Sequence, residues 1–256
     1  MDISNRAIQT VYTLWLREML RYGRSKSRII GSLASPLFFL ILLGNAFKSS
    51  LQFRVGGDYT LDFMAPGIIA MSILFSSIAG GVSIIWDREF GFLKEILIAP
   101  VNRFFVALGK AVGGVTTAMI QGTLILIIAG LIGVKYHSLL GILLSVIVMF
   151  FIGLGFIGLG IALASKIESF EGFNLVMNFI TLPVFFLSGA LFPITKLPTW
   201  LKTLIYFNPL TYGVDALRAL LLEKSEIPLY VDISVIVGFA IFTIAIGGWL
   251  FNKTSG

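Results

Sequence analysis

Six long apolar runs constrain this chain more than any other feature of its sequence. They cover residues 29–47, 63–85, 111–134, 138–165, 172–192 and 233–251. A bilayer core about 30 Å thick is crossed by about 20 helical residues, and each run is close to that length or longer. Hydrophobic residues make up 57% of the 256 residues and charged residues 12%, which is more apolar than a soluble domain of this size requires. The runs therefore indicate a chain whose solvent is lipid.

Backbone polar groups inside lipid must be paired, so only helices and closed barrels can span a membrane. The short alternating segments of a transmembrane barrel are missing from these runs. We therefore predict an all-α, polytopic membrane protein, in which residues 1–256 form a single domain with six transmembrane helices.

The basic residues predict how these helices are oriented. With six spans both termini lie on one side, and placing the termini inside puts 12 of the 19 Lys and Arg residues in inner segments. Cytoplasmic segments are normally the basic ones. We predict a multi-pass protein of the cell membrane with both termini in the cytoplasm. The net charge of +6 then reflects contact with anionic lipid, and no nucleic-acid partner is expected.

Three segments interrupt or flank the apolar runs. Residues 1–28 have the spacing of an amphipathic helix on the inner membrane surface, which could be a simple anchor or a docking surface for a cytoplasmic partner. In the inner loop 86–103, acidic Asp87 and Glu89 favour a helix N-terminus and Pro100 ends the helix near Ala99. The outer segment 193–232 is predicted to form two short re-entrant helices, in which Asp215 and Arg218 can pair on one face.

Two of these segments carry recognisable patterns. The inner loop contains Trp86, Arg88, Glu89, Gly91, Leu93, Glu95, Leu97, Pro100, Val101 and Arg103, followed by Gly109 and Lys110. The outer pattern contains Leu187, Ser188, Gly189, Phe192, Pro193, Leu197, Pro198, Asn208, Pro209, Leu210, Thr211, Tyr212, Asp215, Leu217 and Arg218. With both patterns in matching topological positions, essentially the whole chain resembles the permease subunits of type-2 ABC exporters. That group includes daunorubicin-resistance, nodulation-factor and O-antigen export permeases.

The resemblance implies partners and roles for these residues. Two permeases would pair, either two copies of this chain or this chain and a close paralogue, each bound to a cytoplasmic ABC ATPase. The loop helix would be the coupling helix, and the ATPase-coupling residues would be Arg88, Glu89, Gly91, Leu93, Glu95 and Pro100. Arg17 and Arg21 would be N-terminal docking residues, and Asn208, Pro209, Tyr212, Asp215 and Arg218 would form the outer re-entrant motif. Spans one, two and five would surround the pathway.

Nothing in the sequence provides a nucleotide site in this chain. The only Gly-Lys pair, Gly109-Lys110, is followed by Ala111 and has Phe104 where a phosphate-binding loop needs its first Gly. We therefore expect no cofactor here, with ATP and Mg²⁺ bound by the partner ATPase. Candidates for lining the cargo pathway are uncharged polar residues of the spans, namely Asn45, Ser76, Asn174, Asn178 and Ser188. Each could equally make a helix-to-helix hydrogen bond worth about 0.6 kcal/mol.

The leading interpretation is a permease that exports a hydrophobic or amphipathic, drug-like compound from the cytoplasm or inner leaflet. Export of a lipid-linked polysaccharide by the same architecture stays open. An ion-coupled carrier is disfavoured because the six runs hold no charged residue. A membrane-embedded enzyme is disfavoured because the close acidic pairs, Asp58 with Asp62 and Asp87 with Glu89, flank opposite ends of one span. A structural anchor would not need the outer segment.

Overall fold

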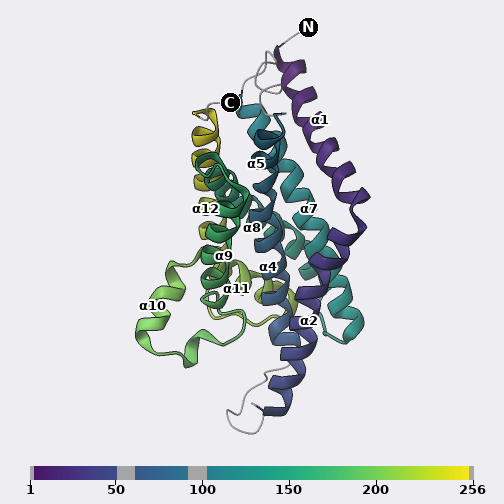
Figure 1. Ribbon diagram of the computed structural model, residues 1–256. Helices are drawn as coiled ribbons and strands as arrows, with labels where there is room; N and C mark the ends of the chain where they lie inside the picture. Colours follow the sequence, from purple (N-terminus) through teal and green to yellow (C-terminus); the bar gives the residue numbers. More distant parts are fainter. Residues whose placement is uncertain (1–2, 51–60, 92–102, 254–256) are drawn as a thin grey trace.

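The computed structural model describes residues 3–50, 61–91 and 103–253 (Figure 1). The helices are α1 (Ile3–Arg24), α2 (Lys26–Ser50), α4 (Leu61–Gly80), α5 (Val82–Glu89), α7 (Arg103–Ile132), α8 (Leu139–Lys166), α9 (Phe170–Phe186), the short 3₁₀ helix η1 (Ile194–Lys196), α10 (Thr199–Phe207), α11 (Pro209–Leu222) and α12 (Leu229–Asn252). All regular structure in these ranges is helical, which confirms the predicted all-α class for this part of the chain. The two ends of the chain lie at the same end of the molecule (Figure 1).

Four stretches of the described residues are long and apolar enough to cross a membrane. They are Leu61–Glu89, Arg103–Ile132, Leu139–Lys166 and Leu229–Asn252. The bent pair Ala7–Arg24 and Ile29–Leu42 would be a fifth if it is one span. The apolar helix α9 has 17 residues and falls short of the usual length. The count of six spans therefore stays a prediction.

Several helices begin or end at residues other than the predicted span boundaries. The predicted third span begins at 111, but α7 begins at Arg103, and the predicted sixth begins at 233, but α12 begins at Leu229. The predicted fifth span ends at 192, whereas α9 ends at Phe186 and the turn after it holds Gly189 at a left-handed φ of 70°. Charged residues end an apolar run in the sequence, but they do not end a helix when the fold buries them, as it buries Lys110 and Asp232.

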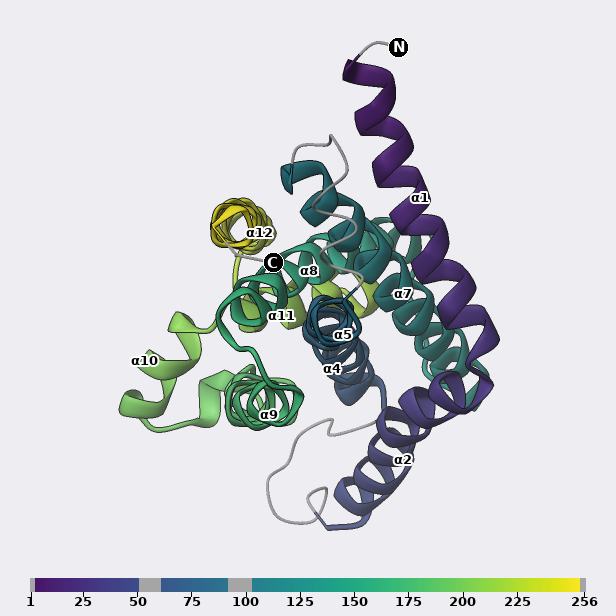
Figure 2. The same cartoon turned by 45° about the horizontal axis from the view of Figure 1, so that its top comes forward.

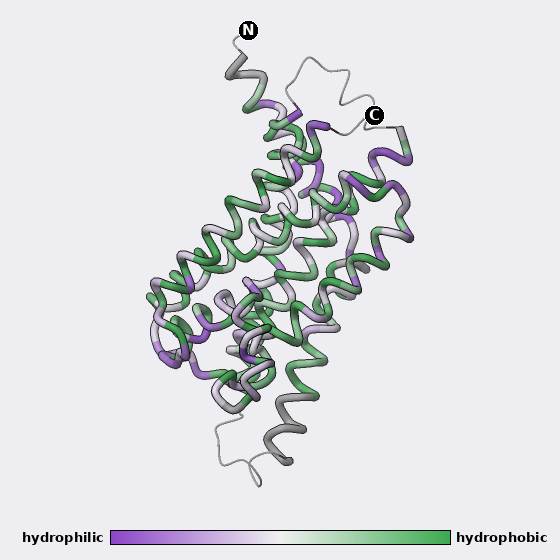
Figure 3. Tube along the Cα trace, turned by 90° about the vertical axis from the view of Figure 1, so that its left-hand side faces the viewer, coloured by the Kyte–Doolittle hydropathy of each residue, from purple (hydrophilic) through white to green (hydrophobic). Residues whose placement is uncertain are grey.

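Helix α8 lies at the centre of the bundle, where it packs against α4, α7, α11 and α12 (Figures 1 and 2). Small residues allow this close packing. A Cβ atom at Gly158 would lie 2.7 Å from the backbone nitrogen of Ile244, and one at Gly160 would lie 2.8 Å from the carbonyl oxygen of Ile78. Close backbone contact through glycine is a common way for membrane helices to associate. Hydrophobic residues dominate the helices, and hydrophilic residues gather toward the two ends of the bundle (Figure 3).

The N-terminal helix α1 packs along α7 (Figure 2). Two glycines on α7 receive it: a Cβ atom at Gly109 would lie 2.9 Å from Cβ of Leu14, and one at Gly113 would lie 2.9 Å from Cβ of Glu18. Ala7 and Leu14 are buried, whereas Ile8 and Tyr12 on the apolar face are exposed. The helix therefore docks on the bundle through small residues and keeps part of its apolar face for its surroundings.

Candidate functional site

A buried carboxylate joins three helices at the end of the bundle where the termini lie. Asp87 of α5 has a side chain only 1% exposed, and Lys110 Nζ of α7 lies 2.5 Å from its Oδ2. The guanidinium of Arg17 on α1 donates to both carboxylate oxygens of Asp87. Lys110 also donates to the carbonyl oxygen of Ser83, at 3.3 Å. A buried charge of this kind is stable only when paired and hydrogen-bonded, so Asp87, Lys110 and Arg17 must be considered together.

The neighbours of Asp87 extend this cluster to two further helices. Arg88 donates to the carbonyl oxygens of Ile167 and Ala164, at 3.2 and 3.5 Å, and so binds the C-terminal end of α8. The ring of Trp86 stacks on Phe170 of α9 with 6.1 Å between centroids, and the guanidinium of Arg21 lies 5.1 Å from the Trp86 ring. Three consecutive residues of α5, Trp86, Asp87 and Arg88, thus contact α1, α7, α8 and α9. We call these three residues, together with the side chains that they contact, Arg17, Arg21, Lys110 and Phe170, the inner cluster.

The inner cluster changes the roles predicted for the loop. Asp87 and Glu89 lie in the last turn of α5, so the prediction that they begin a helix is wrong. At Asp87, the paired cations Arg17 and Lys110 offset the cost of placing a carboxylate near a helix C-terminus. The chain then turns at Gly91, whose φ is 77°, a value that favours glycine. Glu89 is exposed. The predicted coupling residues Leu93, Glu95 and Pro100 lie outside the described residues.

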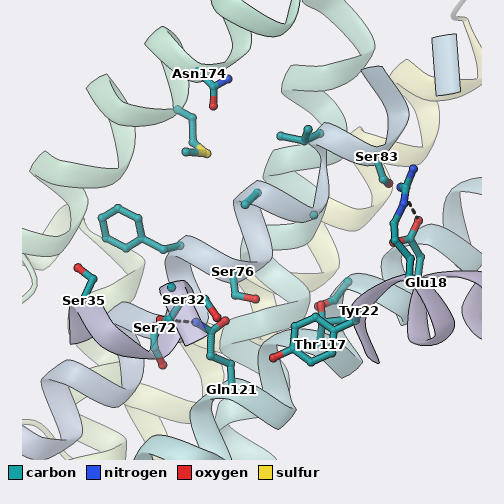
Figure 4. A pocket seen from close by; sticks show the side chains of 18 of the residues that line it. Glu18, Tyr22, Ser32, Ser35, Ser72, Ser76, Ser83, Thr117, Gln121 and Asn174 are labelled. Carbon is teal, nitrogen blue, oxygen red and sulfur yellow. Dashed lines mark hydrogen bonds and ion pairs between the residues drawn. The ribbon is translucent and has the colours of Figure 1, made fainter. Parts of the chain in front are cut away.

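A cavity of about 430 Å³ opens beside this cluster (Figure 4). Its walls come from α1, α2, α4, α5, α7 and α9. The apolar side chains in these walls include Pro36, Met71, Phe75 and Met177. Its uncharged hydrogen-bonding side chains include Tyr22, Ser32, Ser35, Ser72, Ser76, Ser83, Thr117, Gln121 and Asn174, and Glu18 contributes a carboxylate. Arg21, Trp86 and Lys110 belong both to the cavity wall and to the inner cluster.

The five predicted pathway residues have different locations. Ser76 and Asn174 line the cavity, and both are labelled in Figure 4. Ser188 does not, because it is buried in the turn after α9, where its hydroxyl donates to the carbonyl oxygen of Phe185 at 2.6 Å. Asn178 is exposed on α9 and does not line the cavity. The side chain of Asn45 lies outside the described residues.

A second polar cluster lies at the opposite end of the bundle, in the predicted outer segment. Asn208 caps α11 by accepting from the amide of Leu210 at 3.0 Å, and Pro209 follows at the first helical position. Arg218 Nη1 lies 3.6 Å from Asp215 Oδ1, as the sequence spacing predicted, and Nη2 donates to the carbonyl oxygen of Gly189 at 3.0 Å. The two predicted short helices are present as α10 and α11, and their re-entrant course in the membrane stays a prediction.

Asp215 is the hub of this outer cluster. Its carboxylate accepts from the amides of Glu226 and Ile227, at 3.0 and 2.8 Å. Burial raises the pKa of Asp215, while the amide of Ile227 and the charge of Arg218 act in the opposite direction. Tyr212 donates to the carbonyl oxygen of Tyr206 at 2.9 Å and so ties α11 to α10. The outer motif residues therefore fix the shape of this segment.

The pairing of Asp87 with Lys110 was not predicted from the sequence. Both residues were visible, since each is the charged residue closest to an apolar run at the predicted inner face. Two opposite charges at the same depth on consecutive spans can pair, and that signal could have identified them. The contact of Arg88 with the end of α8 had no comparable signal, because backbone carbonyls carry no sequence identity.

The comparison with protein families gives one result. A family model described as "ABC-2 type transporter" matches residues 9–222 of this chain. The matched range contains the inner cluster, the cavity and the helices α10 and α11.

Individual relatives agree with the family match. The ycf38 protein of Cyanophora paradoxa, named as a transport permease, is 29% identical over 85% of this chain and 76% of its own length. Nodulation protein J of Rhizobium leguminosarum bv. trifolii is 28% identical over 82% of this chain and 80% of its length. The inner membrane transport permease YadH of Escherichia coli K12 is 25% identical over 90% of this chain and 89% of its length.

Proposed function

This chain belongs to the ABC-2 type transporter family, and on that premise we propose that it is the permease subunit of an ATP-driven exporter of hydrophobic or amphipathic compounds. Its cargo would leave the cytoplasm or the inner leaflet through the cavity. A separate ABC ATPase would bind ATP and Mg²⁺ and hydrolyse the nucleotide, and this chain would hold no cofactor. The protein would lie in the cytoplasmic membrane with both termini inside.

One observation carries this proposal: the cavity and the inner cluster share residues. Lys110 pairs with Asp87 and also lines the cavity, and Trp86 stacks on Phe170 while forming part of the same wall. A movement of the loop after α5 would displace Asp87, Trp86 and Arg88 together. Because these residues contact α1, α7, α8 and α9, the displacement would reach the helices that shape the cavity.

The cavity wall supports an amphipathic cargo. Methionine, phenylalanine and proline side chains form its apolar part, and Met side chains adapt to ligands of different shape. A row of serine hydroxyls from Ser32, Ser35, Ser72 and Ser76 offers hydrogen bonds without charge. The same row would suit the hydroxyl groups of a lipid-linked polysaccharide, which we therefore keep as the second candidate cargo.

We further propose that a second permease completes the pathway. Three of the helices that line the cavity, α2, α4 and α9, correspond to the predicted spans one, two and five. On α9, Leu175 and Phe179 are 72% and 82% exposed, so this helix presents an apolar face beyond the bundle. A second copy of this chain or a close paralogue would cover that face.

The proposed function can be tested by filling the cavity. Ser76→Trp places an indole among the cavity residues, so we expect cargo-stimulated ATP hydrolysis to fall at least tenfold while the permease still assembles with its ATPase. The measurement is ATP hydrolysis by the reconstituted complex across a panel of amphipathic compounds and lipid-linked glycans. Ser234→Trp is the matched control, because Ser234 is exposed on α12 away from the cavity. Equal stimulation in both variants would contradict the proposal.

A further inference from the structure

Asp232 is the most unusual charged residue of the bundle. It lies in the first turn of α12, its exposed fraction is 0%, and neither of its carboxylate oxygens has a hydrogen-bond partner among the described residues. Asp87 and Asp215 are equally buried, but each has cationic and hydrogen-bonding partners. An ionised carboxylate without partners is very costly in a protein interior, whereas the neutral acid is far less so.

The helices around Asp232 offer it no cation. Helix α12 packs against α7, α8 and α11. The charged residues of α7 are Arg103 and Lys110, and that of α8 is Lys166, all near the opposite end of the bundle. On α11, the titratable and charged residues are Tyr212, Asp215 and Arg218.

Arg218 is already engaged elsewhere. Its guanidinium pairs with Asp215, donates to Gly189 and lies 4.1 Å from the ring centroid of Phe63. Asp215 itself opposes a second negative charge at Asp232. The linker from α11 to α12 also carries Glu223 and Lys224, both exposed, and Glu226, whose Oε2 accepts from the amide of Thr195 at 3.1 Å.

A metal ion is not a good candidate for balancing Asp232. Among the described residues no group of three or more His, Cys, Asp or Glu side chains is gathered to hold one. The proton is the cation that a single buried carboxyl can bind without further ligands.

We propose that Asp232 is a proton-binding site of the closed outer segment. The carboxyl carries its proton on oxygen while α11 and the linker cover it. When α11 moves away and water reaches Asp232, the O–H bond breaks, the proton passes to water and the carboxylate remains on the protein. The site would hold whether or not the cargo and ATPase are as proposed above, because it depends only on α11, α12 and the linker.

The proton site predicts a definite pH dependence. The closed arrangement binds the proton more tightly than an open one, so acid on this side stabilises the closed arrangement and alkali favours opening. Outer pH would therefore change how often the segment opens, without any change in the inner cluster.

Infrared spectroscopy tests the protonation directly. The full-length protein in nanodiscs should show a protonated-carboxyl band that disappears reversibly as the pH is raised. The band should be absent from Asp232→Asn and retained in Glu223→Gln, a matched control whose carboxyl is exposed. Identical carboxyl bands in the wild type and Asp232→Asn would overturn the proposal.

Thermal unfolding gives a second, independent readout. Asp232→Asn mimics the neutral acid, so its unfolding midpoint at neutral pH should equal or exceed that of the wild type and should depend less on pH. Asp215→Asn should lower the midpoint, because Asp215 accepts two amide hydrogen bonds and pairs with Arg218. A lower midpoint for Asp232→Asn, including failure to fold, would mean that Asp232 is ionised and paired, and would overturn the proposal.

A labelling experiment follows the opening itself. The chain has no cysteine, so Ala216→Cys on α11, at a position 0% exposed, provides a single reporter. Its reaction with a water-soluble maleimide should accelerate severalfold between mildly acidic and mildly alkaline pH, after correction for the reactivity of the free thiol. The acceleration should be lost when Asp232→Asn is added. A pH dependence that persists in the double variant would assign the opening to another group.

Discussion

Asp87 illustrates how a charged residue can sit inside a helix that is otherwise built for lipid. Its side chain is 1% exposed, and both Lys110 and Arg17 supply positive charge. Desolvating two ions costs several kcal/mol each, so such a pair adds little net stability, yet losing one member is expensive. The cluster is therefore better suited to holding α1, α5 and α7 in one arrangement than to making the fold more stable.

Removing Asp87 alone is expected to destabilise the protein. Asp87→Ala leaves Lys110 buried without its carboxylate, and we expect it to cost about 3–5 kcal/mol of unfolding free energy. The double variant Asp87→Leu/Lys110→Met removes both charges and should recover most of that loss. Denaturant unfolding of the purified protein, followed by tryptophan fluorescence, would measure both variants.

The control for this experiment is Glu89→Ala, since Glu89 is exposed two residues further along. A surface change of this kind usually alters stability by less than about 0.5 kcal/mol. If the single and double variants lost equal stability, the buried charge of Lys110 would not be the cause.

Among the elements of the fold, α1 is the one whose docking depends most on residues with a role that the sequence alone does not reveal. Gly109 and Gly113 on α7 show the small-residue spacing typical of membrane helices, but the spacing alone does not identify the partner helix. The structure shows that α1 lies on them, with Leu14 and Glu18 in closest contact. The docking of α1 therefore rests on shape as well as on the Arg17–Asp87 pair.

We predict that Gly113→Leu detaches α1. The added side chain would overlap Glu18, and overpacking of this kind typically costs about 1–3 kcal/mol. Hydrogen exchange of the α1 amides should become faster, while the exchange of α8 and α12 stays unchanged. Gly23→Ala is the matched control, because a Cβ atom there meets nothing within 4 Å. Unchanged exchange in α1 for Gly113→Leu would contradict the assigned contact.

The elements themselves were largely predictable from the sequence. Apolar runs long enough for a bilayer identify the helices, and the Asn208-Pro209 pair identifies where α11 begins. The ends were harder, because Asp87, Lys110 and Asp232 look like span limits and instead lie within helices. Their environments are set by other helices: Asp87 and Lys110 pair with each other, whereas Asp232 has no hydrogen-bond partner among the described residues. A local sequence pattern carries no information about such contacts. Of the five predicted pathway residues, Ser76 and Asn174 line the cavity. The sequence could not single out these two, because the packing of the whole bundle decides which helix faces surround the cavity.

For the whole molecule, the orientation in the membrane can be checked by chemical labelling. The chain has no cysteine, so Lys166→Cys and Lys224→Cys each introduce a single reporter, at the ends of the bundle that we assign to the cytoplasm and the exterior. In intact cells a membrane-impermeant maleimide should label Lys224→Cys and should label Lys166→Cys only after permeabilisation. The reverse pattern would invert the topology.

The break between α4 and α5 has a mechanical consequence. Gly81 separates the two helices, and a Cβ atom there would lie 2.5 Å from the carbonyl oxygen of Gly160, so the break is held against the middle of the bundle. One end of this two-part rod carries Trp86, Asp87 and Arg88, and the other runs beside the cavity. A rod supported at one point acts as a lever with Gly81 as its fulcrum. A force on the short arm, α5, would then rotate the rod about Gly81 instead of sliding it along the bundle. The direction of that rotation would decide which wall of the cavity moves first.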